Sequence, residues 1–261
     1  MSGMTKVTKT GLDLTPTELS QAARAALRSY TPARIALDRT GVSLATRPLL
    51  DFQLAHARAR DAVHAAIDVR MLCDELRRCG LPALALKTQA GDRASYLRRP
   101  DLGRALSEDS AALLTAGEYD AVFVIADGLS ALAVERHALH LLRAVLPLIG
   151  GWRLAPVCVV EQGRVAVGDA IGEALHAPLA VMLIGERPGL SSPDSLGVYI
   201  TWEPRRGRKD AERNCISNVR EEGLGYAAAA SRLHYYMQEA ARRRMTGLGL
   251  KDPAEDVAGL L

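Results

Sequence analysis

One stretch of the chain, Leu179–Gly189, joins an apolar run to a short loop whose polar side chains could contact a ligand. The run Leu179–Ile184 is too short and too uniformly apolar for an amphipathic helix, so it predicts a strand buried on both faces. Glu186 and Arg187 follow it between glycines, which let a backbone come close to a ligand. Because ligands of open α/β sheets bind at the carboxyl ends of strands, this loop is a candidate binding element. A tight turn that ends the strand and binds nothing is the competing interpretation.

Polar residues also follow the other predicted strands. The carboxyl ends of these strands are expected to converge on one edge, where the residues would line a single crevice. Asp127 and Ser130 could begin a helix whose free N–H groups face an anion, but an ordinary helix cap is the favoured interpretation. The expected segments are Lys87–Thr88, Asp127–Ser130, Gln162–Val165, Gly185–Gly189 and Trp202–Pro204.

No set of residues in the sequence makes a convincing catalytic or metal site. Cys215 has no histidine near it in sequence, and a cysteine nucleophile needs a base or a strongly electropositive site, so a small buried residue is the favoured interpretation. His137 and His140 are three positions apart on a predicted helix and could hold a metal, but without a third ligand a solvated helix face is favoured. We therefore assign no catalytic residue and no metal ligand to this chain.

Composition narrows the classes of partner. The formal net charge is +3, from 33 basic and 30 acidic residues, which is too balanced for nucleic acid as the main partner. No window approaches the roughly 18 apolar residues of a membrane-spanning helix. Four cysteines without a C-x-x-C pair, and no apolar leader at the N-terminus, predict a reduced, cytosolic protein.

The first part of the chain has a helical pattern. Thr15-Pro-Thr-Glu predicts a helix start, and that helix should run to about Leu27. A longer apolar periodicity covers about Pro48 to Cys79, with a break expected near Asp68 and Gly80 as its C-cap. Since the long helix mixes arginine, aspartate and apolar residues, it suits docking on another chain.

Beyond Gly80, short apolar runs alternate with helical patterns, which is typical of βαβ units. The predicted fold class is α/β, with a doubly wound, mostly parallel, Rossmann-like sheet preceded by a helical N-terminal segment. The expected division is 1–80 for the helical segment and 81–261 for the α/β domain. The fifth strand follows a loop rather than a helix, so it is expected to be antiparallel or to lie at an edge. The predicted strands are 81–87, 119–126, 155–160, 179–184 and 196–201, and the predicted helices between and after them are 107–116, 130–149, 167–175 and 226–246.

Several stretches combine charged residues, glycines and a cysteine in orders that are rarely shared by chance. They are Leu50–His64, Ala126–Ser130, Gly163–Val165, Leu183–Leu190, Arg213–Asn218 and Gly247–Leu250. Together they resemble the small (light) subunit family of ethanolamine ammonia-lyase, over about residues 32–251.

The resemblance implies an adenosylcobalamin-dependent lyase that converts ethanolamine to acetaldehyde and ammonia. In that family a separate large subunit, a TIM barrel, holds the substrate, and the small subunit covers the cobalamin. The cofactor keeps its own dimethylbenzimidazole on cobalt (base-on) and carries the radical chemistry. The chain alone is expected to be inactive, with the 1–80 segment as the candidate for docking on the large subunit.

Three positions of the family's cobalamin contacts can be matched in this sequence: Val165 of Gly-Arg-Val, Glu186 of Gly-Glu-Arg-Pro-Gly, and Cys215 of Cys-Ile-Ser-Asn. The resemblance implies that Glu186 accepts hydrogen bonds from cofactor amides, while Val165 and Cys215 form part of the wall. Alternatives are a stand-alone α/β module that binds cobalamin or a nucleotide-like ligand, and a structural partner that clamps the large subunit without touching cofactor. The sequence leaves open whether the complex lies free in the cytosol or in a bacterial microcompartment.

Overall fold

The computed structural model describes residues 16–31 and 33–251, and it divides the chain into two compact units, Met1–Ala57 and Arg58–Leu261. The expectation of a helical segment over 1–80 falls partly on residues 1–15, which lie outside the described residues.

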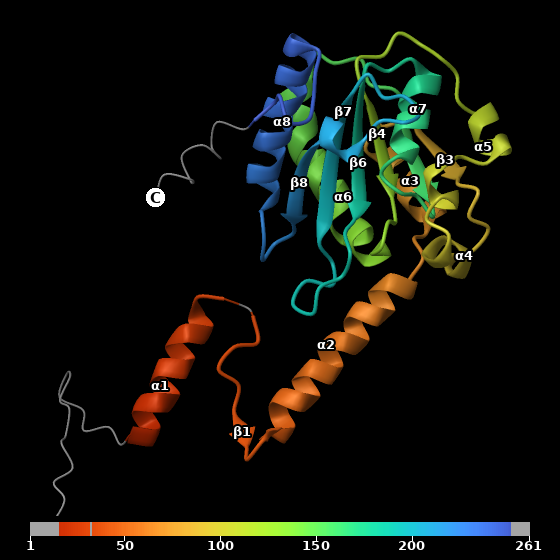
Figure 1. The fold of residues 1–261 in the computed structure, drawn as a ribbon. Helices are drawn as coiled ribbons and strands as arrows, with labels where there is room; N and C mark the ends of the chain where they lie inside the picture. The colour runs from red at the N-terminus through yellow and green to blue at the C-terminus, as the bar shows by residue number, and fades with distance from the viewer. Residues whose placement is uncertain (1–15, 32, 252–261) are drawn as a thin grey trace, which may run out of the picture. The chain divides into compact units, whose positions relative to one another are not determined.

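The first unit contains α1 (Pro16–Ser29), the two-residue strands β1 (Arg39–Thr40) and β2 (Ser43–Leu44), and the start of α2 (Thr46–His64). The antiparallel pair β1–β2 turns at Gly41, whose φ of +62° is the left-handed conformation that glycine tolerates. The predicted first helix is confirmed by α1, which begins at the expected proline (Figure 1).

The predicted break in the second helical stretch is confirmed at Asp68. This residue caps α3 (Val69–Arg78) by accepting a hydrogen bond from the Met71 N–H at 2.9 Å. Gly80 follows the C-cap residue Cys79 and has φ +79°, the left-handed conformation that commonly ends a helix. The glycine expected at the C-terminal end of this helix is therefore confirmed. The buried side of α3 packs against β3 (Ala83–Lys87) and β5 (Val157–Glu161), two neighbouring strands of the main sheet.

The second unit is built on a six-stranded mixed sheet with the order β3-β5-β4-β6-β7-β8 (Figure 1). The first four strands in that order are parallel, whereas β7 is antiparallel to β6 and β8 is antiparallel to β7. Strand β6 is buried along its whole length, as its apolar run predicts. The strands are β3 (Ala83–Lys87), β4 (Val122–Ala126), β5 (Val157–Glu161), β6 (Leu179–Gly185), β7 (Leu196–Trp202) and β8 (Asn214–Val219).

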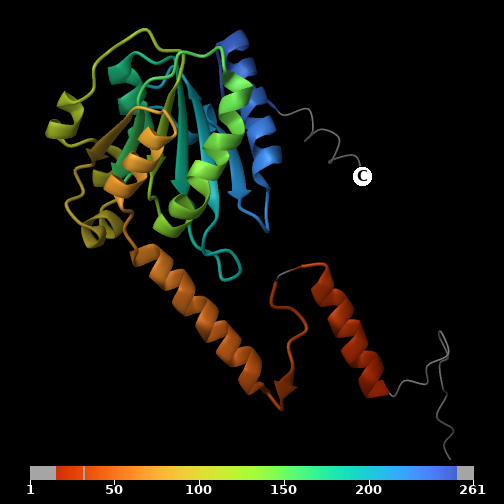
Figure 2. The ribbon, with the colours of Figure 1, turned by 180° about the vertical axis from the view of Figure 1, so that it is seen from behind.

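Helices cover both faces of this sheet. The helices α3, α6 (Ala131–Val145) and α8 (Tyr226–Arg243) share one apolar core with the sheet. The view from behind shows these three helices on the same side of the sheet (Figure 2). The other face carries α7 (Val167–Leu175), which packs on β4 and β6. The remaining helical turns are α4 (Arg93–Arg98), α5 (Glu108–Ala112) and the 3-10 turns Leu102–Arg104, Leu146–Ile149 and Asp210–Glu212.

The mixed α/β class and all five predicted strands are confirmed, while the doubly wound, Rossmann-like description remains a prediction. β7 is antiparallel to β6, which confirms one of the two expectations for the fifth strand. The other is wrong, because a sixth strand that was not predicted, β8, pairs with the outer side of β7 and takes the edge of the sheet. Among the helices of the described residues, none is long and apolar enough to cross a membrane.

One part of the predicted crevice is wrong. Because β7 is antiparallel, its carboxyl end pairs with the start of β6, with Trp202 opposite Leu179. Trp202–Pro204 therefore lies at the opposite edge of the sheet from Glu186. The amino end of β7 takes its place, since Leu196 is opposite Gly185.

Candidate functional site

The loops after β4 and β6 meet at the carboxyl edge of the sheet with no side chain between them. A Cβ on Gly128 would lie 2.3 Å from the Gly185 carbonyl oxygen, and one on Gly185 would lie 2.0 Å from the Ser130 carbonyl oxygen. The Leu129 N–H donates to the Gly185 carbonyl at 2.9 Å. Ser130, rather than Asp127, then caps α6, which confirms the predicted cap for Ser130 alone.

A pocket of ≈ 440 Å³ opens beside these glycines and includes both Val165 and Glu186 in its lining. Tyr96, Arg164 and Tyr199 also line it. A second pocket of ≈ 440 Å³ shares Arg164, Val165 and Tyr199 with the first, so the two adjoin. The structure thus brings two of the three predicted site residues to one cavity.

The Glu186 carboxylate is held in a fixed position by three hydrogen-bond donors. The Ser195 hydroxyl donates to one of its oxygens, and the Ser217 hydroxyl donates to the other at 2.5 Å. The Asn218 N–H donates at 3.2 Å to the oxygen that Ser195 also binds. Gly197 leaves room for this side chain, because a Cβ there would lie 3.0 Å from Glu186 Cγ. The carboxylate is therefore oriented before any ligand arrives.

The loop that carries Val165 is held by buried polar contacts. The Gly163 N–H donates to Asp127 Oδ1 at 3.1 Å, and the Tyr96 hydroxyl donates to the Gly163 carbonyl at 2.9 Å. Asp127 also pairs with Arg93, with Nη1 and Oδ2 3.2 Å apart. Burial raises the pKa of Asp127 to about 6, although Arg93 and the backbone donors act in the opposite direction.

Two guanidinium groups lie close to the ring of Tyr96. The Arg164 Cζ is 4.2 Å and the Arg93 Cζ is 4.8 Å from the ring centroid. Desolvation raises the pKa of the Tyr96 hydroxyl, so it remains a neutral donor. These contacts fix Arg164 in the pocket wall next to Val165.

Cys215 lies on β8, directly opposite Tyr199 of β7, and is exposed rather than buried. The favoured interpretation from its sequence context, a small buried residue, is therefore wrong. Loss of hydration around the sulfur raises the pKa of the thiol to about 11, and the Glu186 charge adds to that shift. A thiol with this pKa is not an activated nucleophile.

A buried ion pair fixes the start of β8. The Arg213 guanidinium binds Asp169 of α7 through two contacts of 2.5 and 2.6 Å, and both side chains are 2% exposed. Arg213 also donates to the Thr201 hydroxyl at 2.9 Å. The pair therefore links α7, β7 and the strand that carries Cys215.

The two histidines of α6 do not form the solvated face that the sequence favours, because His137 is buried. Its Nδ1 lies 2.8 Å from the Tyr226 hydroxyl, and the His140 ring stacks on the same tyrosine. Among the described residues, no group of three or more potential ligands could hold a metal ion.

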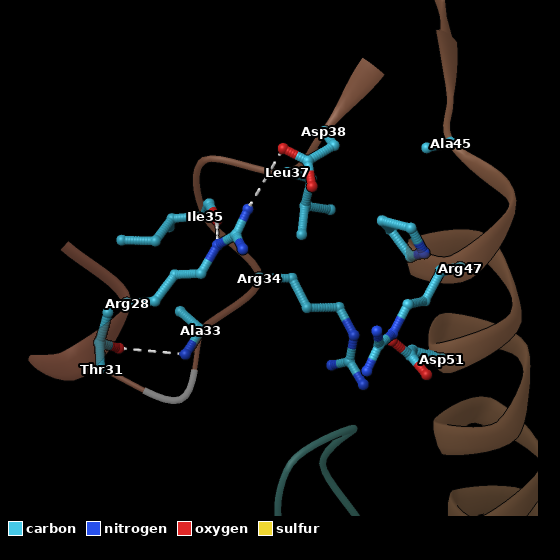
Figure 3. Close-up of a pocket in the computed structure, with 11 residues that line it drawn as sticks. Arg28, Thr31, Ala33, Arg34, Ile35, Leu37, Asp38, Ala45, Arg47 and Asp51 are labelled. Carbon is cyan, nitrogen blue, oxygen red and sulfur yellow. Dashed lines mark hydrogen bonds and ion pairs between the residues drawn. The ribbon is translucent and has the colours of Figure 1, made fainter. Parts of the chain in front are cut away.

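The first unit has a separate pocket of ≈ 690 Å³ that is rich in arginine (Figure 3). Arg28 donates to the Ile35 carbonyl at 3.3 Å and pairs with Asp38 at 3.9 Å. The side chains of Arg34 and Arg47 extend toward one another near Asp51. Nothing in the sequence analysis predicted this pocket.

A comparison with protein families connects this chain to one of them. The family model described as "Ethanolamine ammonia-lyase light chain (EutC)" matches residues 21–251. The chain belongs to this family.

Individual relatives agree with this light-chain assignment. The ethanolamine ammonia-lyase small subunit of Pseudomonas aeruginosa is 59% identical over 237 residues, which cover 88% of this chain and 87% of the relative. The Azotobacter vinelandii small subunit is also 59% identical over 237 residues, covering 88% of each chain. The Ralstonia nicotianae small subunit is 57% identical over 251 residues, covering 93% of each. The resemblance stated from the sequence motifs is confirmed.

Within this light chain, the three positions matched to cofactor contacts lie on neighbouring elements. Val165 and Glu186 share a pocket, and Cys215 faces Tyr199, which lines the same pocket. Sequence reasoning missed Tyr199 and the Tyr96–Arg93 pair. The alternation of side chains along β7 could have indicated Tyr199, since its two neighbours at positions 198 and 200 belong to the core.

Proposed function

We propose that this chain and a large subunit together form the adenosylcobalamin site of an ethanolamine ammonia-lyase, which converts ethanolamine to acetaldehyde and ammonia. The observation that carries the proposal is the shared pocket of Val165 and Glu186 at the carboxyl edge of the sheet. The family membership supports the reaction, because relatives bear the name of that enzyme.

The residues around the pocket fit a large ligand that is rich in amides. A carboxylate offers about four acceptor positions, and three donors of the chain occupy Glu186, so it can accept one more hydrogen bond. Gly128 and Gly185 let the loops after β4 and β6 pack closely against each other at the pocket edge, so no side chain at these two positions fills the space there. Arg164 Nε is buried without a hydrogen-bond partner among the described residues, which leaves a donor at the pocket wall.

When bound, adenosylcobalamin supplies the radical chemistry of the reaction. Glu186 would orient the bound group through an amide hydrogen bond. Val165 and Cys215 would pack against it and exclude water from the covered face, with the thiol neutral because of its raised pKa. We assign no proton transfer to this chain.

We also propose that the N-terminal segment, residues 1–80, docks on the large subunit. Apolar side chains on α2 support this role, since Leu50 is 57% exposed, and Phe52 and Leu54 are exposed as well. The arginine-rich pocket of the first unit adds a polar site for carboxylates of a partner.

The test is a turnover assay with purified subunits. Acetaldehyde would be followed with adenosylcobalamin and ethanolamine in the presence of this chain, the large subunit, or both. Activity that requires both chains supports the proposal. Absence of turnover in the mixture, together with cobalamin retained by this chain alone, would favour a stand-alone cobalamin-binding module.

A further inference from the structure

The loop between β6 and β7 is tied to α6 just before it reaches the pocket. Arg136 Nη1 donates to Asp194 Oδ2 at 2.7 Å, and His137 Nε2 lies 3.5 Å from the same oxygen. The Ser130 hydroxyl donates to the Pro193 carbonyl at 2.8 Å. Asp194 is buried although it carries a charge, which is costly unless such partners are present.

The residue after Asp194 is the one that orients Glu186. The Ser195 hydroxyl donates to the Glu186 carboxylate, and the Ser195 carbonyl accepts from the Glu186 N–H at 2.9 Å. A single peptide unit therefore separates the anchor on α6 from both contacts to Glu186. Any shift of Asp194 moves the hydroxyl that holds the carboxylate.

The buried partner of Asp194, His137, is itself held in place. His137 is buried on α6 and lies against the Tyr226 hydroxyl of α8 through Nδ1. Arg136 lies on the same helix, one position earlier. The anchor thus belongs to the rigid layer of α6 and α8 rather than to the loop.

We infer that Asp194 is a positioning residue for cofactor binding: it fixes Ser195 and so sets the orientation of Glu186 toward cobalamin. This inference rests on the proposed role of Glu186. It assigns Asp194 no contact with the cofactor, so its effect must pass through Glu186. Removing Asp194 leaves the Glu186 carboxylate in place but less constrained.

The experiment is a double-mutant cycle in the complex of this chain with the large subunit. Binding of cyanocobalamin, an unreactive probe, would be measured by equilibrium dialysis for Asp194→Ala, Glu186→Ala and the double variant. We expect Asp194→Ala to raise the dissociation constant about three- to tenfold, a range typical of residues that act through one hydrogen-bond network. In the Glu186→Ala background the same change should have no further effect.

Three further variants separate positioning from general destabilisation. Asp194→Asn keeps the shape and one acceptor oxygen, so it should restore part of the affinity. Arg136→Gln removes the 2.7 Å contact on an exposed side chain and should weaken binding in the same direction. Asp120→Ala removes a carboxylate paired with Arg153 next to the amino end of β4 and should leave the dissociation constant unchanged.

Two results would overturn the inference and have different meanings. If Glu186→Ala weakens binding and the Asp194→Ala effect simply adds to it, Asp194 acts independently of Glu186. If Glu186→Ala itself leaves the affinity unchanged, the proposed role of Glu186 fails, and the inference fails with it.

Discussion

Tyr199 and Cys215 lie opposite each other across the antiparallel pair β7–β8, on the side of the sheet that faces the pocket. Desolvation raises the pKa of both the Tyr199 hydroxyl and the Cys215 thiol, so both stay protonated. Cys215 adds to the rise at Tyr199, whereas the hydrogen bond from Tyr199 lowers the pKa of the thiol without cancelling the effect of desolvation. The pair forms a neutral wall beside the charged Glu186.

This neutrality predicts the behaviour of Cys215→Ser. Since the thiol offers no anion near neutral pH, we expect turnover of the complex to stay within about fivefold of the wild type, the effect of one neutral hydrogen bond. Acetaldehyde production with saturating cofactor measures this. Complete loss of turnover with normal cobalamin binding would contradict the assignment of Cys215 as a wall residue.

Val165→Trp should weaken cobalamin binding because the indole would fill the shared wall of the two adjoining pockets. Overpacking of this kind predicts an increase of about tenfold or more in the dissociation constant. Val165→Ala is the control, since it leaves the space open and should have a smaller effect. Unchanged affinity of the tryptophan variant would remove Val165 from the cofactor site.

Asp169→Ala should destabilise the second unit strongly, because it leaves the buried Arg213 guanidinium without its carboxylate. The expected loss in the free energy of unfolding is about 3–5 kcal/mol, measured by denaturant titration. Asp210 lies 3.5 Å from Arg213 Nε but is 95% exposed, so Asp210→Ala should cost less than about 0.5 kcal/mol. Equal losses in both variants would mean that burial does not decide the strength of this pair.

Asp127 gives a pH-dependent prediction. Its pKa is about 6 in the folded chain and about 3.9 in an unfolded one, so the folded state keeps its proton to higher pH. Between these two values the unfolded state binds fewer protons, and the free energy of unfolding therefore falls as pH rises. Relative to Asp127→Asn, the wild type should lose about 2–3 kcal/mol between pH 4 and pH 7. A constant difference over that range would show that Asp127 has an ordinary pKa.

The exposed apolar side chains of α2 predict an assembly defect. Leu50 and Leu54 together should contribute several kcal/mol if a partner buries them, so a Leu50→Asp, Leu54→Asp double variant should weaken binding to the large subunit by about a hundredfold. Leu113→Asp is a matched control, because Leu113 is 55% exposed in the second unit. Co-elution of the complex measures both. Normal assembly of the double variant would exclude this face of α2 from the interface.

Local sequence patterns predicted most of the sheet. The uninterrupted apolar runs located β4 and β6, and Asp68 marked the break between α2 and α3 because its side chain caps the second helix. These features depend on neighbours in sequence, which is why they could be inferred without a structure.

The parts that escaped prediction depend on distant partners. β8 contains Asn214, a polar residue that is buried because its side-chain amide donates to the Leu250 carbonyl at 2.6 Å. Arg93 and Asp127 are 34 positions apart, and no local pattern indicates that they pair. The loop before β7 left two possibilities open, an antiparallel strand or an edge strand, and the predicted crevice took no account of the first. Trp202–Pro204 was therefore placed at the wrong end of the sheet.

The hydrogen bonds that hold the Glu186 carboxylate depend on the order in which the chain is synthesised. Its three donors include groups from residues 217 and 218, on a strand that is synthesised after all the others of the sheet. Chains emerge from the ribosome amino end first, so the parallel strands can pair before these donors exist. A nascent chain that stops before β8 would therefore have its sheet begun but its Glu186 side chain unfixed. The orientation of the Glu186 carboxylate is therefore complete only after residues 217 and 218 have been synthesised.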